Sequence, residues 1–289
     1  LIFDGAGTFV FGRADLFDDF TAVDLQGGTM NIQNYTDTVA GFTLSAGGTI
    51  TGTTGTLTAD NYRLVNGTVD GRLGAGTISV SGPVYVTTNG HFDSSSALNV
   101  AGALTLDSYQ TVAAVKLTSG SINGGTLHGD SYAVARGVIG SNLTGAGDLT
   151  KSTTGTVTLS GVNDYTGATT ISQGSLVLDG GSLVGSNASA VTVSSGATFA
   201  GYGTASRAVI VSGTISPGIG AGSARVGTLS TSSQTWNGGG TYAWDIANVA
   251  GTAGTDWDLL NLGGGKLSIN SVFTLNVIGL IPAGFSSSV

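Results

Sequence analysis

Apolar and polar residues alternate along this chain in short runs. The runs TISVSG, ALTLDS, TVTLSG, SLVLDG, AVTVSS and AVIVSG each place two or three apolar side chains on one face and polar side chains on the other. This period of two is typical of a half-buried β-strand. Each run ends near Gly, Asp or Ser, which suit tight turns, and no stretch combines a long helical period with a capping signature. The pattern predicts an all-β protein with almost no α-helix.

The chain also contains a long internal repeat. Residues 55–73, GTLTADNYRLVNGTVDGRL, match residues 125–143, GTLHGDSYAVARGVIGSNL, and the wider likeness joins 42–79 to 115–150. A unit of about seventy residues is too long for one coil and fits three coils of roughly 20 to 25 residues. One coil has too few apolar side chains to bury alone, whereas stacked coils form a continuous core. The repeat therefore predicts a right-handed parallel β-helix, a β-solenoid.

Large aromatic side chains are concentrated near the two ends of the sequence. The amino-terminal set is Phe3, Phe9, Phe11, Phe17 and Phe20, and the carboxy-terminal set is Trp236, Tyr242, Trp244 and Trp257. The end coil of a solenoid has unpaired strand edges, so it needs a cap or an assembly partner. We expect the carboxy-terminal set to form a cap that plugs the core; a ligand or assembly surface is the alternative.

These observations divide the chain into three predicted regions. Residues 1–40 form an amino-terminal cap or the first coils, and residues 41–235 form the β-solenoid with its internal repeats. Residues 236–289 form an aromatic-rich carboxy-terminal β segment, expected to be a cap or an assembly region.

Composition narrows the class of protein. Hydrophobic residues make up 40% of the chain, enough for a core, while 50 Gly, 3 Pro and 9% charged residues are unlike a disordered chain. The formal net charge of -8 disfavours nucleic acids and anionic membranes as partners, because both favour clusters of Lys and Arg. The chain has no Cys, hence no disulfide and no thiolate metal site. No apolar stretch reaches the roughly 18 residues of a membrane span.

Residues 147–180 carry the most specific pattern, GDLTKSTTGTVTLSGVNDYTGATTISQGSLVLDG. Its order of residues resembles the autotransporter-associated β-strand repeat. The positions that match are Gly147, Leu149, Thr150, Lys151, Gly155, Thr156, Val157, Thr158, Leu159, Ser160, Gly161, Asn163, Tyr165, Thr166, Gly167, Thr169, Thr170, Ile171, Gly174, Leu176, Leu178 and Gly180. Thr154 and Asp164 depart from the pattern, in place of Gly and Thr, and we expect both on the polar surface.

The resemblance has implications for location and role. Such repeats occur in passenger domains of bacterial autotransporters and in large exported proteins of environmental bacteria, where they form β-solenoids displayed or released outside the cell. Residues 211–230 and 240–269 are similar to later parts of the same proteins. A secreted or cell-surface location is therefore expected, in keeping with an acidic, Cys-free chain rich in Gly, Ser and Thr.

Two acidic pairs are the closest approach to catalytic or metal-binding chemistry. Asp18 with Asp19, and Asp256 with Asp258, could each be a carboxylate pair or a cation site, but turn caps and solvated surface are the expected roles. Asp256 and Asp258 would share one face of a strand. They are the calcium candidates of the sequence, and no other cofactor is predicted.

The two histidines suggest no catalytic site. His91 and His128 stand far apart in the sequence without a companion carboxylate motif, so we expect surface polar residues. No catalytic residue is predicted.

Two functions remain open from the sequence. The first is a non-enzymatic extracellular scaffold, structural or adhesive, which assembles end to end into fibres and has other copies of itself or cell-surface and matrix polysaccharide as partners. The alternative is a carbohydrate-active β-helix, a polysaccharide lyase or glycosidase, that uses Asp residues brought together by the fold.

Overall fold

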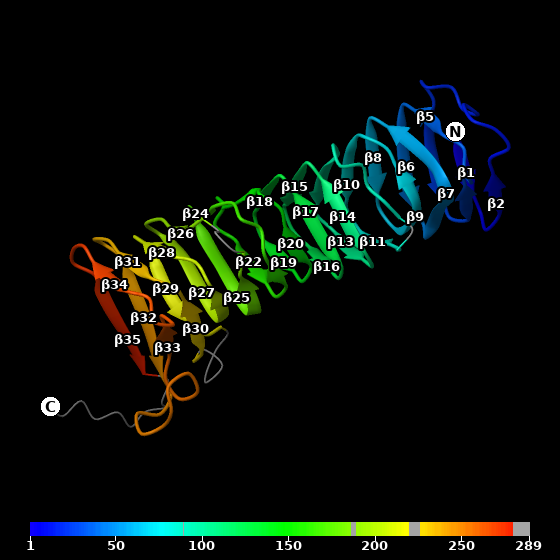
Figure 1. Ribbon diagram of the computed structural model, residues 1–289. Helices are drawn as coiled ribbons and strands as arrows, with labels where there is room; N and C mark the ends of the chain where they lie inside the picture. The colour runs from blue at the N-terminus through cyan, green and yellow to red at the C-terminus, as the bar shows by residue number, and fades with distance from the viewer. Residues whose placement is uncertain (89, 186–188, 220–225, 280–289) are drawn as a thin grey trace. The chain divides into compact units, whose positions relative to one another are not determined.

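The computed structural model describes residues 1–88, 90–185, 189–219 and 226–279. Within these ranges there is no helix, and the strands pair in parallel with strands of neighbouring coils (Figure 1). The predicted all-β parallel solenoid is confirmed. The chain forms two compact units: the first unit is Leu1–Ala133 with Gly137–Ala146, and the second unit is Val134–Arg136 with Gly147–Val289.

The described strands of the first unit form three sheets (Figure 1, blue to green). The first sheet contains β1 (Ile2–Asp4), β3 (Ala22–Gln26), β6 (Gly41–Ser45), β8 (Asn61–Leu64), β10 (Thr77–Val80), β12 (Ala97–Val100), β15 (Ala114–Leu117) and β18 (Ser131–Val134). The second sheet contains β2 (Thr8–Val10), β4 (Thr29–Asn31), β5 (Asp37–Val39), β7 (Gly48–Ala59), β9 (Gly67–Leu73), β11 (Pro83–Val86), β13 (Ala103–Leu106), β16 (Ser121–Asn123) and β19 (Gly137–Ile139). The third sheet contains β14 (Tyr109–Val112), β17 (Thr126–Gly129) and β20 (Asn142–Thr144).

The strand register gives the length of each coil in the first unit. Phe42 pairs with Tyr62, Tyr62 with Ile78, Ile78 with Leu98, and Leu98 with Val115, so partners are 16 to 20 residues apart. Two of these spacings equal the lower limit of the expected 20 to 25 residues per coil, and the other two are shorter than expected. Short Gly-containing corners allow these shorter coils, and the repeat therefore spans about four coils instead of three.

The core of the first unit is a stack of inward side chains. Phe42, Ile78, Leu98 and Val115 each have an exposed fraction of at most 1%. Neighbouring strands lie about 4.8 Å apart, so each inward side chain contacts its equivalents in the next coils. Burying one such side chain contributes roughly 1.5–3 kcal/mol. The stack of coils, and not any single coil, therefore provides the hydrophobic stabilisation.

The internal repeat places the same polar side chain in two coils. Tyr62 is 1% exposed, and its hydroxyl oxygen accepts a hydrogen bond from Ala59 N at 2.8 Å. The same oxygen lies 2.8 Å from Leu57 O and 3.1 Å from Gly74 O, to which it donates. The corresponding partners of Tyr132 are Gly129 N, Leu127 O and Thr144 O. Both copies of the repeat thus contain a buried tyrosine hydroxyl that forms hydrogen bonds with backbone N–H and C=O groups at a corner.

Glycines line one corner of the first unit, where successive coils come into close contact. A Cβ on Gly102 would lie 2.4 Å from Gly82 N, one on Gly120 would lie 1.9 Å from Gly102 O, and one on Gly137 would lie 2.3 Å from Gly120 O. Gly120 also has a φ of 77°, a conformation that other residues rarely adopt. The high Gly content is thus partly a requirement for stacking coils at this corner.

The described strands of the second unit form two sheets (Figure 1, green to red). Its first sheet contains β21 (Asp148–Lys151), β24 (Thr169–Ile171), β26 (Val191–Val193), β28 (Val209–Val211), β31 (Gln234–Trp236) and β34 (Leu267–Ile269). Its second sheet contains β22 (Thr156–Leu159), β23 (Val162–Asn163), β25 (Gly174–Leu183), β27 (Ala197–Ala205), β29 (Thr214–Pro217), β30 (Thr228–Thr231), β32 (Thr241–Ile246), β33 (Leu259–Asn261) and β35 (Thr274–Gly279). The described residues contain no helix that could span a membrane.

Candidate functional site

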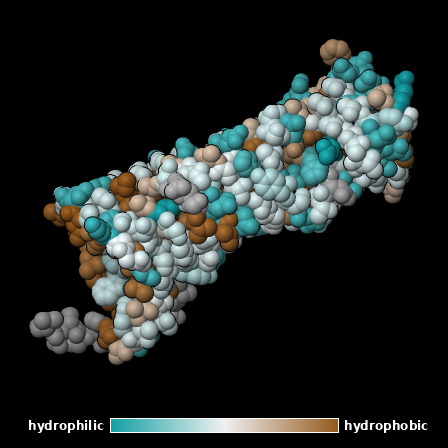
Figure 2. All heavy atoms as spheres, viewed as in Figure 1, coloured by the Kyte–Doolittle hydropathy of each residue, from teal (hydrophilic) through white to brown (hydrophobic). Residues whose placement is uncertain are grey.

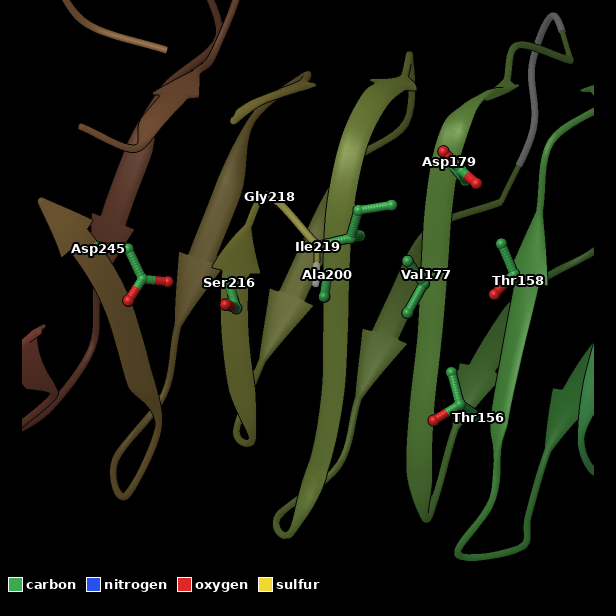
Figure 3. Close-up of a pocket in the computed structure, with 9 residues that line it drawn as sticks. All are labelled: Thr156, Thr158, Val177, Asp179, Ala200, Ser216, Gly218, Ile219 and Asp245. Atoms are coloured by element: carbon green, nitrogen blue, oxygen red, sulfur yellow. The ribbon is translucent and has the colours of Figure 1, made fainter. Parts of the chain in front are cut away.

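A groove crosses the outer face of the second sheet in the second unit (Figure 3). Its volume is about 460 Å³. Five neighbouring strands contribute to it, β22, β25, β27, β29 and β32, together with the two residues that follow β29. The residues that line it are Thr156, Thr158, Val177, Asp179, Ala200, Ser216, Gly218, Ile219 and Asp245.

The strand register explains why this face is hollow. Thr158, Val177, Ala200 and Ser216 form one row, because each is the register partner of the next. Figure 3 shows Val177 and Ala200 between Thr158 at one side and Ser216 at the other. Ala200 and Ser216 have small side chains, so this row forms the low floor of the groove. A trough therefore runs across the strands, in the direction in which the coils stack.

A second row of outward residues supplies hydroxyl groups beside this floor. Its members occupy the first outward position of successive strands. They are Thr156, Ser175, Thr198, Thr214 and Thr241. Because hydroxyl groups both donate and accept hydrogen bonds, the row offers a regularly spaced polar surface.

Two carboxylates give the groove its charge. Asp179 is half-buried and accepts a hydrogen bond from the hydroxyl of Tyr202 on the neighbouring strand. That hydrogen bond raises the pKa of Tyr202, because ionised tyrosine could no longer donate. Asp245 is 2% exposed and lies at the β32 side of the groove (Figure 3). None of the lining residues of this groove is basic, so it is electronegative.

The chemistry available in the groove is hydrogen bonding to a polar ligand. Hydroxyls can donate and accept, whereas carboxylates accept only. Within the residues that the structure describes, no group of three or more His, Cys, Asp or Glu side chains is placed to hold a metal ion.

The family-like stretch around residues 149–178 extends over two successive coils of the second unit, because Leu149 pairs with Thr169 and Leu159 with Leu178. Between Gly161 and Ile171 every second residue is buried. Asn163 is 0% exposed, and its Nδ2 donates to Gly161 O at 2.9 Å and to Ser182 O at 3.0 Å. Its side chain therefore links two successive coils.

Lys151 is a second buried polar residue of this stretch. It is 0% exposed, and burial lowers the pKa of its ammonium group. Its Nζ donates to Thr153 Oγ1 and to Gln173 O, both at 3.1 Å, and to the carbonyl of Thr153. Thr154 and Asp164, where the chain departs from the family pattern, are exposed as expected.

Arg207 is a buried cation that sequence reasoning did not identify. It is 2% exposed, and its guanidinium carbon lies 4.3 Å from the ring centre of Tyr165. It donates to Gly167 O at 3.1 Å and to Tyr165 O, and so joins a later coil to the family-like stretch. Burial lowers the pKa of Arg207, and the cation–π contact with Tyr165 favours its charged form. A lone Arg in a polar segment gives no signal for this role.

The four carboxy-terminal aromatic residues of the prediction lie together. Trp236, Tyr242, Trp244 and Trp257 all line one open, mainly apolar hollow of about 510 Å³. Trp236 stacks on Phe273 with ring centres 4.2 Å apart. The hollow is open, and the choice between a cap and an assembly surface stays a prediction.

Apolar side chains beside this hollow are exposed. Figure 2 shows them as brown spheres at the end of the molecule where β34 and β35 lie. Leu267 is 43% exposed, Ile269 58%, Leu275 56% and Val277 52%. These four residues define the apolar end surface.

The carboxylates of Asp256 and Asp258 accept hydrogen bonds from backbone amides. Asp258 is 3% exposed; its Oδ1 accepts from Gly227 N at 3.0 Å and its Oδ2 from Asp245 N at 2.9 Å. Asp256 Oδ2 accepts from Thr252 N at 2.7 Å within a turn. Asp256 therefore caps a turn, whereas Asp258 is buried and bonds amides far away in the chain, unlike the solvated turn cap that we expected. A calcium role for the pair stays a prediction.

The remaining candidates of the first unit do not converge on a site. Asp18 Oδ1 accepts from Phe20 N at 2.8 Å, a turn cap, and Asp19 is exposed. The half-buried His128 has its Nδ1 3.3 Å from Thr144 Oγ1, and the half-buried His91 lies in another coil.

The amino-terminal phenylalanines behave as a cluster with one exception. Phe3, Phe9, Phe11 and Phe17 contact one another with ring centres 4.7 to 5.9 Å apart. Phe20 is 90% exposed. Four of the five therefore pack together at the first coil.

Comparison with known proteins identifies the family-like stretch. Residues 149–178 match the family described as passenger-associated-transport-repeat. The match lies within residues 147–180, so their identification as an autotransporter passenger-type repeat is confirmed. No curated protein and no solved structure matches this chain. The repeat and the parallel solenoid together are those of a passenger-like protein.

Proposed function

We propose that this protein is a non-enzymatic extracellular β-solenoid, because it contains a passenger-associated transport repeat that folds as part of a parallel solenoid. Its role is structural or adhesive, at a bacterial cell surface or in a matrix. The observation that carries the proposal is the repeat at 149–178. The interior positions of that repeat support it, because Lys151, Asn163 and Tyr165 bind backbone and side-chain groups of the protein itself.

We further propose that the apolar end surface mediates self-assembly. β34 pairs with β31 and β35 pairs with β32, and the described residues place no strand on their other edges. An open edge with exposed apolar side chains is a template for pairing with another chain. A head-to-tail contact of this kind generates an open filament.

Location and assembly have separate tests. Intact expressing cells treated with a protease should lose the protein while a cytoplasmic marker survives; full protection of the protein would contradict the extracellular location. For assembly, analytical ultracentrifugation and electron microscopy of purified protein should show concentration-dependent oligomers. Leu275→Asp should reduce them, while Val162→Asp, at a residue 57% exposed elsewhere in the second unit, should not. A wild-type protein that stays monomeric at high concentration would refute assembly.

The absence of enzymatic activity is tested with neutral and acidic polysaccharides. We expect no release of reducing ends and no unsaturated products. Turnover that disappears in Asp179→Asn or Asp245→Asn would overturn the non-enzymatic proposal, because these are the carboxylates of the groove. Turnover that disappears in Asp256→Asn or Asp258→Asn would do the same.

A further inference from the structure

We propose that the groove of the second unit binds a single extended chain of a neutral glycan. This inference deepens the proposed function, since it rests on an adhesive protein outside the cell and names the chemistry of its partner. Four features of the groove carry the proposal. They are the row that contains Thr158, the row that contains Thr156, and the carboxylates of Asp179 and Asp245.

The shape of the groove favours a linear polymer. Its lining extends across five adjacent strands, which is about 19 Å at a strand spacing of 4.7–4.9 Å. A volume of about 460 Å³ along this length is a narrow trough with Ala200 on its floor. Such a trough fits one extended chain that lies along the stacking direction of the coils. A folded polymer or a flat aromatic ligand would not fill it.

The spacing of the polar groups favours a sugar polymer. The hydroxyl row beside the groove, of which Thr156 is a lining residue, repeats once per coil at about 4.8 Å, close to the length of one pyranose ring. Thr158 and Ser216 present hydroxyls at the two sides of the floor, and the half-buried Asp179 carboxylate can accept hydrogen bonds from sugar hydroxyls. A peptide strand would instead pair with backbone groups at a sheet edge, and this groove lies on a sheet face.

The charge of the groove selects among glycans. Two carboxylates and no basic lining residue repel uronates and sulfated sugars. The chain as a whole has a net charge of -8, which acts in the same direction. The expected ligand is therefore neutral, with no carboxylate or sulfate groups.

The test is binding of four neutral hexasaccharides, cellohexaose, mannohexaose, laminarihexaose and maltohexaose, measured by isothermal titration calorimetry on the whole chain. At least one should bind, and polygalacturonate should not. Thr158→Val and Asp179→Asn should each weaken binding about tenfold, the effect of one lost hydrogen bond. Ala200→Phe should abolish it by filling the floor.

A matched control separates the groove from the rest of the second unit. Thr192→Val removes a half-buried outward hydroxyl on β26, in the other sheet of the same unit, and should leave binding unchanged. Circular dichroism confirms that each variant is folded. Failure of all four hexasaccharides to bind, equal binding of polygalacturonate, or an undiminished affinity in both Thr158→Val and Asp179→Asn would overturn the inference. Any of these results in a protein that is still protease-accessible on cells refutes the groove alone and leaves the proposed location standing.

Discussion

Removing the hydroxyl of Tyr62 should destabilise its coil, and removing that of Tyr132 should do so equally. Tyr62→Phe keeps the ring and deletes one oxygen, which accepts from Ala59 N at 2.8 Å and donates to a nearby carbonyl. Tyr132 makes the corresponding contact with Gly129 N at 2.7 Å. Because the two tyrosines occupy equivalent positions of the internal repeat, each site tests the same prediction independently.

The expected magnitude follows from the groups left without a partner. A buried amide that loses its acceptor costs about 1–3 kcal/mol, and Tyr62 is 1% exposed, so water does not replace the hydroxyl directly. With the donated bond included, the loss in free energy of unfolding should be about 2–3 kcal/mol. That is a large share of the roughly 5–15 kcal/mol typical of a folded domain.

The assay must be local, because the coils of a solenoid can open separately. Hydrogen exchange should show faster exchange of the Ala59 amide in Tyr62→Phe, and of the Gly129 amide in Tyr132→Phe. Urea unfolding followed by far-UV circular dichroism gives the global value. Tyr109→Phe is the control, since Tyr109 is 53% exposed and should change stability by less than about 0.5 kcal/mol. Unchanged protection of Ala59 in Tyr62→Phe would refute the reasoning.

Three further predictions concern packing and pH. Arg207→Ala should lower the free energy of unfolding by about 2–4 kcal/mol, because the cation–π contact and two carbonyl bonds are lost; urea unfolding that matches wild type would contradict this. Gly120→Ala should cost more than about 3 kcal/mol, whereas Gly196→Ala, with the same φ of 77° and nothing within 4 Å of the new Cβ, should cost only about 1 kcal/mol; equal thermal shifts would exclude a packing effect. Burial raises the pKa of Tyr62 and of Tyr165, so the folded state keeps protons that the unfolded chain loses, and stability should fall above about pH 10 by up to about 1.4 kcal/mol per pH unit for each of them. Urea midpoints that do not change between about pH 9 and about pH 11 would exclude this linkage.

The stretch that contains the family repeat has some buried positions that the sequence predicts and one that it does not. The alternation around Thr156 to Leu159 predicted a strand with Val157 and Leu159 inward, and both are 0% exposed. Lys151 matched the family pattern, but its burial could not be derived from it. A lysine next to a polar turn is usually solvated, and only the neighbouring coil places the Gln173 carbonyl within reach of its Nζ.

The strand period and the stacking of coils could be predicted from the order of amino acids alone, because they depend on neighbours within one strand or on a repeat. The coil length, the partner of Arg207 and the groove became clear only from the three-dimensional fold. Thr158, Ala200 and Ser216 belong to three different coils, and their row exists because the register aligns them. A register is fixed by corner lengths and by packing between coils, so residues far apart in the chain become neighbours that no local pattern records.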